Sequence, residues 1–132
     1  MKDKDMYRRS ALSQYSTVDV ETSASTQDPH HLIQMLFDKA CVLMRQAMEQ
    51  LKRGETDSFR DATNHTMQIV LGLRGVLDME KGGDLAQTLY DSYTSISASL
   101  FKARNELDAV ATEKLYLAIS ELKEGWASVS KS

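Results

Sequence analysis

Apolar residues recur every three or four positions in four separate stretches, and this pattern limits the fold more than any other feature. Residues with this spacing share one face of an α-helix, so each stretch predicts an amphipathic helix with a buried face. The four stripes are Leu32, Leu36, Ala40, Leu43, Ala47 and Leu51; Phe59, Ala62, Thr66, Ile69, Leu73 and Val76; Leu85, Leu89, Tyr93, Ile96, Leu100, Ala103 and Leu107; and Leu115, Ala118 or Ile119, Leu122, Trp126 and Val129. The presence of one proline and six glycines in 132 residues agrees with a helical chain.

Local signals for helix ends flank the first stripe. Asp28 and Pro29 favour a helix start, because aspartate accepts bonds from the first free amides and proline fits the first helical position. Gly54 is expected to end this helix. The second helix is predicted to start near Thr56 or Asp57, only a few residues later.

The stretch LDMEKGGDL, residues 77–85, holds two adjacent glycines between two apolar stripes. We predict that Lys81 lies in the last turn of the second helix and that Gly82 ends it in the left-handed conformation. Gly83 then continues the turn, and Asp84 caps the third helix. A phosphate-binding loop is the alternative interpretation, but it requires a preceding strand and glycine spacings that this sequence lacks.

The short connections between the stripes predict the topology. Helices of similar length joined by short loops run antiparallel, so we predict an all-α, up-down-up-down four-helix bundle over residues 28–130. Residues 1–27 are polar and rich in serine and threonine, which predicts a partly flexible N-terminal arm or a short helix. The few apolar residues of this arm include Leu12, Tyr15, Val18 and Val20.

Composition argues against several classes of protein. The net charge is −3 with both signs interspersed, so a basic face for nucleic acid is not expected. No apolar run reaches the length of a membrane span, and the first ten residues lack the apolar centre of a signal peptide, so we expect a cytoplasmic protein without membrane insertion. Cys41 is the single cysteine, and its place beside an apolar stripe favours a buried packing role.

Catalytic and metal-binding patterns are not found. The inward Glu-x-x-His pairs of di-metal bundles are missing, and His30, His31 and His65 are best interpreted as surface or half-buried residues. The carboxylates fall on polar faces. We therefore predict no catalytic residue, no metal site and no cofactor, and we interpret the chain as a binding protein and not an enzyme. Its seven methionines either fill the core or provide an adaptable binding surface.

Several segments, taken together in order, resemble one known family. The segment YSTVDVE (residues 15–21) precedes PHHLIQMLFD (residues 29–38), and LDMEKGGDLAQTL (residues 77–89) follows. Trp126 lies near the end, after a leucine-rich helix. The order and spacing of these segments are similar to those of the FliS family of flagellar secretion chaperones.

Two departures from the family pattern concern the third helix. The stretch SYTSISASL (residues 92–100) lacks one tyrosine and one basic residue of the pattern, and Arg104 replaces an asparagine. These changes leave a divergent flagellin or another flagellar partner as alternatives for the client.

The resemblance implies a cytoplasmic helical bundle without enzymatic activity. Such a protein binds the disordered C-terminal segment of newly made flagellin, prevents premature polymerisation and presents flagellin for export. The resemblance also implies that the N-terminal arm covers a groove in the free state, with Leu12 and Tyr15 as its anchors.

Apolar positions on the second and third helices are the predicted client groove: Val70, Leu77, Leu89, Tyr93 and Ile96. For each of these positions, plain core packing is the alternative interpretation. The alternative function is a helical adaptor or regulator that binds another flagellar protein, with flagellin not its main client. A third hypothesis, a bundle enzyme with a metal or cofactor, is directly testable by metal analysis.

Overall fold

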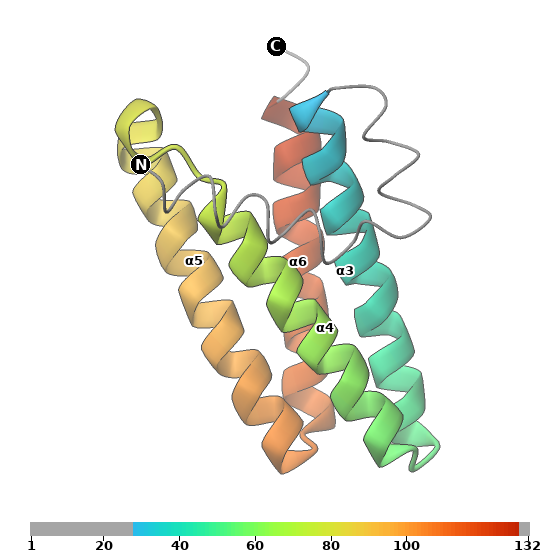
Figure 1. Ribbon diagram of the computed structural model, residues 1–132. Helices are drawn as coiled ribbons and strands as arrows, with labels where there is room; N and C mark the ends of the chain where they lie inside the picture. Colours follow the sequence, from blue (N-terminus) through green and yellow to red (C-terminus); the bar gives the residue numbers. More distant parts are fainter. Residues whose placement is uncertain (1–27, 130–132) are drawn as a thin grey trace.

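The computed structural model describes residues 28–129, which form four α-helices (Figure 1). These are α3 (Pro29–Lys52), α4 (Thr56–Gly75), α5 (Met79–Glu106) and α6 (Ala109–Val129). The described part of the chain contains no strand, which confirms the all-α fold class. The predicted arm, with Leu12 and Tyr15, lies outside the described residues.

The four helices pack as an antiparallel bundle in which consecutive helices are neighbours (Figure 1). α3 packs closely against α4 and α6, and α4 packs closely against α5. The pair α5 and α6 makes the fewest contacts of the four neighbouring pairs. The bundle is therefore packed less closely between α5 and α6 than between its other neighbouring helices.

The predicted stripes form the interior. Phe37, Met44, Ile69, Leu100 and Ile119 are fully buried, and together they come from all four helices. A smaller buried cluster lies between α3 and α4, near the connection that joins them, and consists of Ala47, Phe59 and Ala62. Periodicity in the sequence thus identified most of the inward residues of each helix, but Leu85 and Leu107 of the third stripe are exposed.

The ends of α3 follow the local signals. The Asp28 carboxylate accepts a hydrogen bond from the backbone N–H of His30 at 3.1 Å, and Pro29 is the first helical residue. Gly54 lies just beyond the end of α3 and has a φ of +74°. The start of α4 at Thr56 also agrees with the prediction.

The predicted boundary between the second and third helices was wrong. α4 ends at Gly75, and residues 76–78 make the connection. The Asp78 carboxylate accepts from the backbone N–H groups of Glu80 and Lys81 at 3.1 and 3.0 Å, so Asp78 and not Asp84 begins α5. Leu77 in the connection packs on the core, which is why the apolar pattern continued past the true end of α4.

The glycine pair lies inside α5. Gly83 has φ +54° and ψ −133°, so it interrupts the helix between its first turn and the long remainder. Gly82 lies close to the following turn, since a Cβ built at this position would be 2.5 Å from the Cβ of Ala86. The two glycines therefore permit a sharp break at the beginning of α5, and they do not form the connection between the helices.

Candidate functional site

Two surface depressions flank α6. The first lies between α5 and α6, has a volume of about 530 Å³, and is called the α5–α6 groove. It is lined by Asp91, Ser92, Ser95, Ile96, Ala118, Glu121 and Leu122. The second lies between α3 and α6, has a volume of about 410 Å³, and is called the α3–α6 depression.

Small side chains explain why the α5–α6 groove is open. Ser92 and Ser95 lie on the side of α5 that faces the groove, and Ala118 lies on the opposite side of it, on α6. None of these three side chains is long enough to fill the space between the two helices. Ile96 and Leu122 provide apolar surface in the groove. The result is an open depression, with apolar surface from Ile96, Ala118 and Leu122, that a further helix can approach closely.

The edges of the α5–α6 groove are acidic. Asp91 on α5 and Glu121 on α6 are both exposed to solvent. The Asp91 carboxylate accepts a hydrogen bond from Gln87 Nε2 at 2.9 Å, one turn earlier on the same helix. The residues that line this groove include no lysine, arginine or histidine.

Side-chain contacts fasten α6 to α3 on the other side. Lys123 Nζ lies 2.9 Å from an oxygen of Asp38, and this hydrogen bond raises the pKa of Lys123. Trp126 donates its indole N–H to the carbonyl oxygen of His30 at 3.3 Å, and the two rings stack with centroids 4.7 Å apart. These contacts hold α6 against α3. The α5–α6 groove lies on the opposite side of α6.

The α3–α6 depression differs in its charges. It is lined by Arg45, Met48, Glu49, Leu51, Lys52, Ala109, Glu113, Tyr116 and Leu117. Both signs are therefore present. Arg45 crosses part of this surface and donates a hydrogen bond to the hydroxyl of Tyr116 at 3.3 Å.

Exposed apolar side chains lie close to these surfaces. Leu117 on α6 is 52% exposed and Leu85 on α5 is 60% exposed. Leu85 precedes Ser92 by seven residues, so both lie on the same side of α5.

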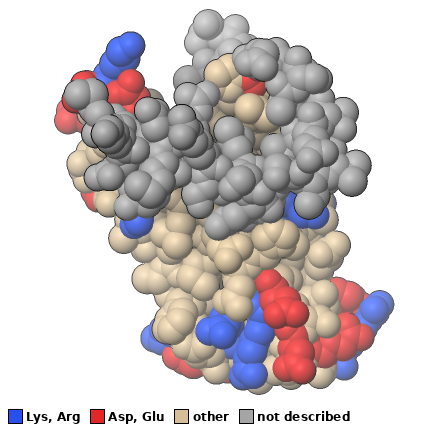
Figure 2. Space-filling model, viewed as in Figure 1, with Lys and Arg blue, Asp and Glu red and all other residues tan. Residues whose placement is uncertain are grey.

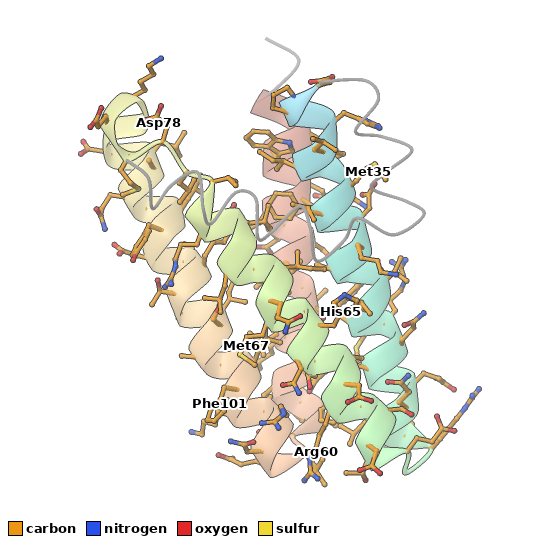
Figure 3. All side chains as sticks on the ribbon, in the orientation of Figure 1. Met35, Arg60, His65, Met67, Asp78 and Phe101 are labelled. Carbon is orange, nitrogen blue, oxygen red and sulfur yellow. The ribbon has the colours of Figure 1, made fainter. Side chains whose placement is uncertain are left out.

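The face formed by α4 and α5 carries few charges at its middle and more of them toward its lower end (Figure 2). Arg74 lies over the ring of Tyr90 at 4.9 Å and donates to the hydroxyl of Thr94 at 3.0 Å. Phe101 projects outward from the lower part of α5 (Figure 3).

The structure places the predicted groove residues in different environments. Val70 and Tyr93 are buried in the main core, and burial raises the pKa of Tyr93 to about 12. Leu77 and Leu89 are half-buried and pack against the same core. Ile96 is nearly buried but lines the α5–α6 groove. These five residues thus do not form one open surface.

Ser92, Ser95, Ala118 and Leu122 were not predicted to belong to a client groove, and Ala118 and Leu122 were expected only as part of the inner stripe of the fourth helix. A signal for this side of α5 was present in the serine-rich stretch SYTSISAS, residues 92–99, where small side chains replace bulky ones on a helix. In residues 28–129 no group of three or more His, Cys, Asp or Glu side chains is arranged to hold a metal ion. None of the four described helices is long and apolar enough to cross a membrane.

Comparison with known proteins decides the family. A model of the family described as flagellar protein FliS matches residues 11–132 of the 132-residue chain. The chain belongs to the FliS family. FliS relatives include the flagellar secretion chaperone FliS of Salmonella typhimurium, which is 33% identical over 95% of this chain and 93% of its own length.

Two further FliS-family relatives come from other bacteria. The flagellar secretion chaperone FliSB of Pseudomonas aeruginosa is 31% identical over 95% of this chain and 99% of its own length. The flagellar secretion chaperone FliS of Vibrio cholerae is 26% identical over 92% of this chain and 89% of its own length. The family resemblance seen in the sequence motifs is thereby confirmed across nearly the whole chain.

Proposed function

We propose that this chain is a cytoplasmic export chaperone that binds the disordered C-terminal segment of flagellin, prevents its premature polymerisation and aids its secretion. The observation that carries this proposal is the α5–α6 groove, an open depression lined by apolar, small and acidic side chains, in a protein of the FliS family. The role requires binding and release, and it requires no catalytic step.

Physical chemistry supports a helical client in this groove. A disordered segment loses conformational entropy when it binds, and it must recover this free energy by burying apolar surface. A helix does so by placing residues spaced by three and four positions along a groove. Ile96 and Leu122 offer such a surface on α5 and α6.

The direct test is a titration with the C-terminal segment of flagellin from the same bacterium, labelled with a dye and followed by fluorescence anisotropy. We expect micromolar or tighter binding and a gain of helix in the segment by circular dichroism. Ser95→Trp places a large ring in the groove, and since Ser95 is exposed we expect normal folding with at least tenfold weaker binding.

The matched control is Ala98→Trp, which adds the same ring to an exposed position of α5 that does not line the groove. It should change the affinity by less than about twofold, because the groove remains open. Equal weakening by both variants would remove the α5–α6 groove from the proposal. No binding of flagellin to the unaltered protein would favour the alternative function, an adaptor for another flagellar protein.

The proposed contribution of the N-terminal arm is tested separately. Deleting residues 1–20 should raise the apparent affinity in this titration if the arm competes with the client for the groove. The groove of the shortened protein would then always be free to bind the client. Tyr15→Ala should change client affinity more than thermal stability. A large fall in melting temperature with unchanged affinity would assign Tyr15 a structural role.

A further inference from the structure

We propose that the α5–α6 groove selects client helices whose apolar stripe is flanked by basic side chains. This inference rests on the proposed chaperone function and specifies the client chemistry that the groove prefers. It is carried by the distribution of charge around the groove, together with the small and apolar side chains that line it.

The carboxylates are placed on both walls of the groove. Asp91 belongs to α5 and Glu121 belongs to α6, so a helix bound between them has one carboxylate along each side. Both side chains are exposed, and within residues 28–129 neither forms an ion pair. Their negative charge therefore remains available to a partner.

The nearest basic residues do not line the groove, and Arg74 of α4 is held over Tyr90 and hydrogen-bonded to Thr94. Lys123 lies two positions after Glu121, but its ammonium group is paired with Asp38 of α3 on the other side of α6. Lys102 and Lys114 are exposed on the same two helices. They are eleven residues from Asp91 and seven from Glu121, or about 16 and 10 Å along the helix axes, where physiological salt screens much of their effect.

The geometry of a bound helix brings its flanking residues to these carboxylates. An apolar stripe seated on Ile96 and Leu122 directs the positions beside the stripe toward the two walls. Lysine and arginine there can lay their methylene stems along the apolar surface and extend their charged ends to Asp91 and Glu121. Glutamate or aspartate at the same positions would be repelled.

The small residues of the groove add a second requirement. Ser92, Ser95 and Ala118 leave space between α5 and α6, so large apolar side chains of the client are needed to fill it. The α3–α6 depression provides an internal comparison. Arg45 and Lys52 are present there together with Glu49 and Glu113, and a mixed lining of this kind gives no strong preference for one sign of charge.

The test uses three synthetic peptides with the same leucine stripe and with lysine, glutamine or glutamate at the flanking positions. Each is labelled and titrated by fluorescence anisotropy against the full chain. Two exposed charge pairs predict binding of the lysine peptide about fivefold tighter than the glutamine peptide at about 0.1 M salt, with the glutamate peptide weakest. The difference should largely vanish at about 1 M salt, where the screening length is about 3 Å.

The variant that locates the effect is the double substitution Asp91→Asn and Glu121→Gln, which keeps both side-chain shapes. We expect it to make the three affinities equal. The control is Asp57→Asn with Asp61→Asn, which removes the same charge from exposed positions on α4 and should preserve the order of the three peptides.

Each outcome has a defined meaning. Equal binding of the three peptides, no binding of any of them, or the same effect from the α4 control would overturn the charge preference. Ser95→Trp should weaken all three peptides, and if it does not, they bind elsewhere and the inference is again overturned. The flagellin titration tests the proposed function independently, so flagellin can fail to bind while the preference for basic flanks is retained.

Discussion

Gly83 provides the sharpest test of how the backbone of α5 is built. Its φ of +54° and ψ of −133° lie where residues with a Cβ are very rarely found. Apart from the adjoining backbone and chain neighbours, no atom lies within 4 Å of the place that a Cβ would occupy, so Gly83→Ala causes no clash with a more distant side chain. The whole effect of that substitution should therefore arise from the backbone.

The expected loss of stability can be worked out from the backbone conformation alone. Holding a residue in such a sparsely populated backbone conformation costs about 1–3 kcal/mol of stability. The upper half of this range applies to alanine here, because this region is nearly restricted to glycine. We therefore expect Gly83→Ala to lower the free energy of unfolding by about 2–3 kcal/mol. For a domain of this size that corresponds to a fall in melting temperature of roughly 6–12 °C.

The assay is chemical denaturation followed by circular dichroism, with D-alanine at position 83 introduced by peptide ligation as the control. D-alanine favours the mirror image of the conformations that L-alanine favours, and the mirror image of the Gly83 angles is ordinary extended backbone. D-alanine should therefore be neutral, or stabilise by about 0.5 kcal/mol through the unfolded chain. Equal destabilisation by the two alanines would refute the argument from backbone strain.

Three further predictions concern the core and the helix contacts. Phe59→Ala should lower the free energy of unfolding by about 3–5 kcal/mol, because Phe59 is 0% exposed. Phe101 is 51% exposed, so Phe101→Ala should change the free energy of unfolding by less than about 0.5 kcal/mol. Urea unfolding of both variants measures this difference. Trp126→Phe should lower the free energy of unfolding by about 1 kcal/mol because it removes the hydrogen bond to His30, and amide exchange should rise at the start of α3 with little change at the start of α4. Burial raises the pKa of Tyr93 from 10 to about 12, so the unfolded chain loses the Tyr93 hydroxyl proton at a lower pH than the folded chain does. The free energy of unfolding should therefore fall as the pH rises from about 10 to 12. Tyr93→Phe should reduce that fall, and an unchanged pH profile would contradict the attribution to Tyr93.

Helix ends were predictable where a single local signal was present. Asp28, Pro29 and Gly54 each act through neighbouring backbone groups, so the limits of α3 agreed with expectation. The boundary before α5 was different because Asp78 and Asp84 are both suitable first residues for a helix. Only the bonds that Asp78 accepts in the folded chain distinguish them.

The groove was less accessible to sequence reasoning than the core. Periodicity identifies which face of a helix is apolar, and it selected Val70, Tyr93 and Ile96 without distinguishing buried residues from residues that line an opening. That distinction depends on how far apart α5 and α6 lie and on the small size of Ser95 and Ala118 between them. Both are properties of the packed bundle.

The packing of α3 against α6 has a consequence for folding during synthesis. Part of the apolar face of α3 is covered by α6, and among the described helices α6 is synthesised after α3, α4 and α5. Until then, a nascent chain that ends before Ala109 keeps the α6 side of α3 in water. The chain is thus itself exposed to aggregation until residues 109–129 have been synthesised.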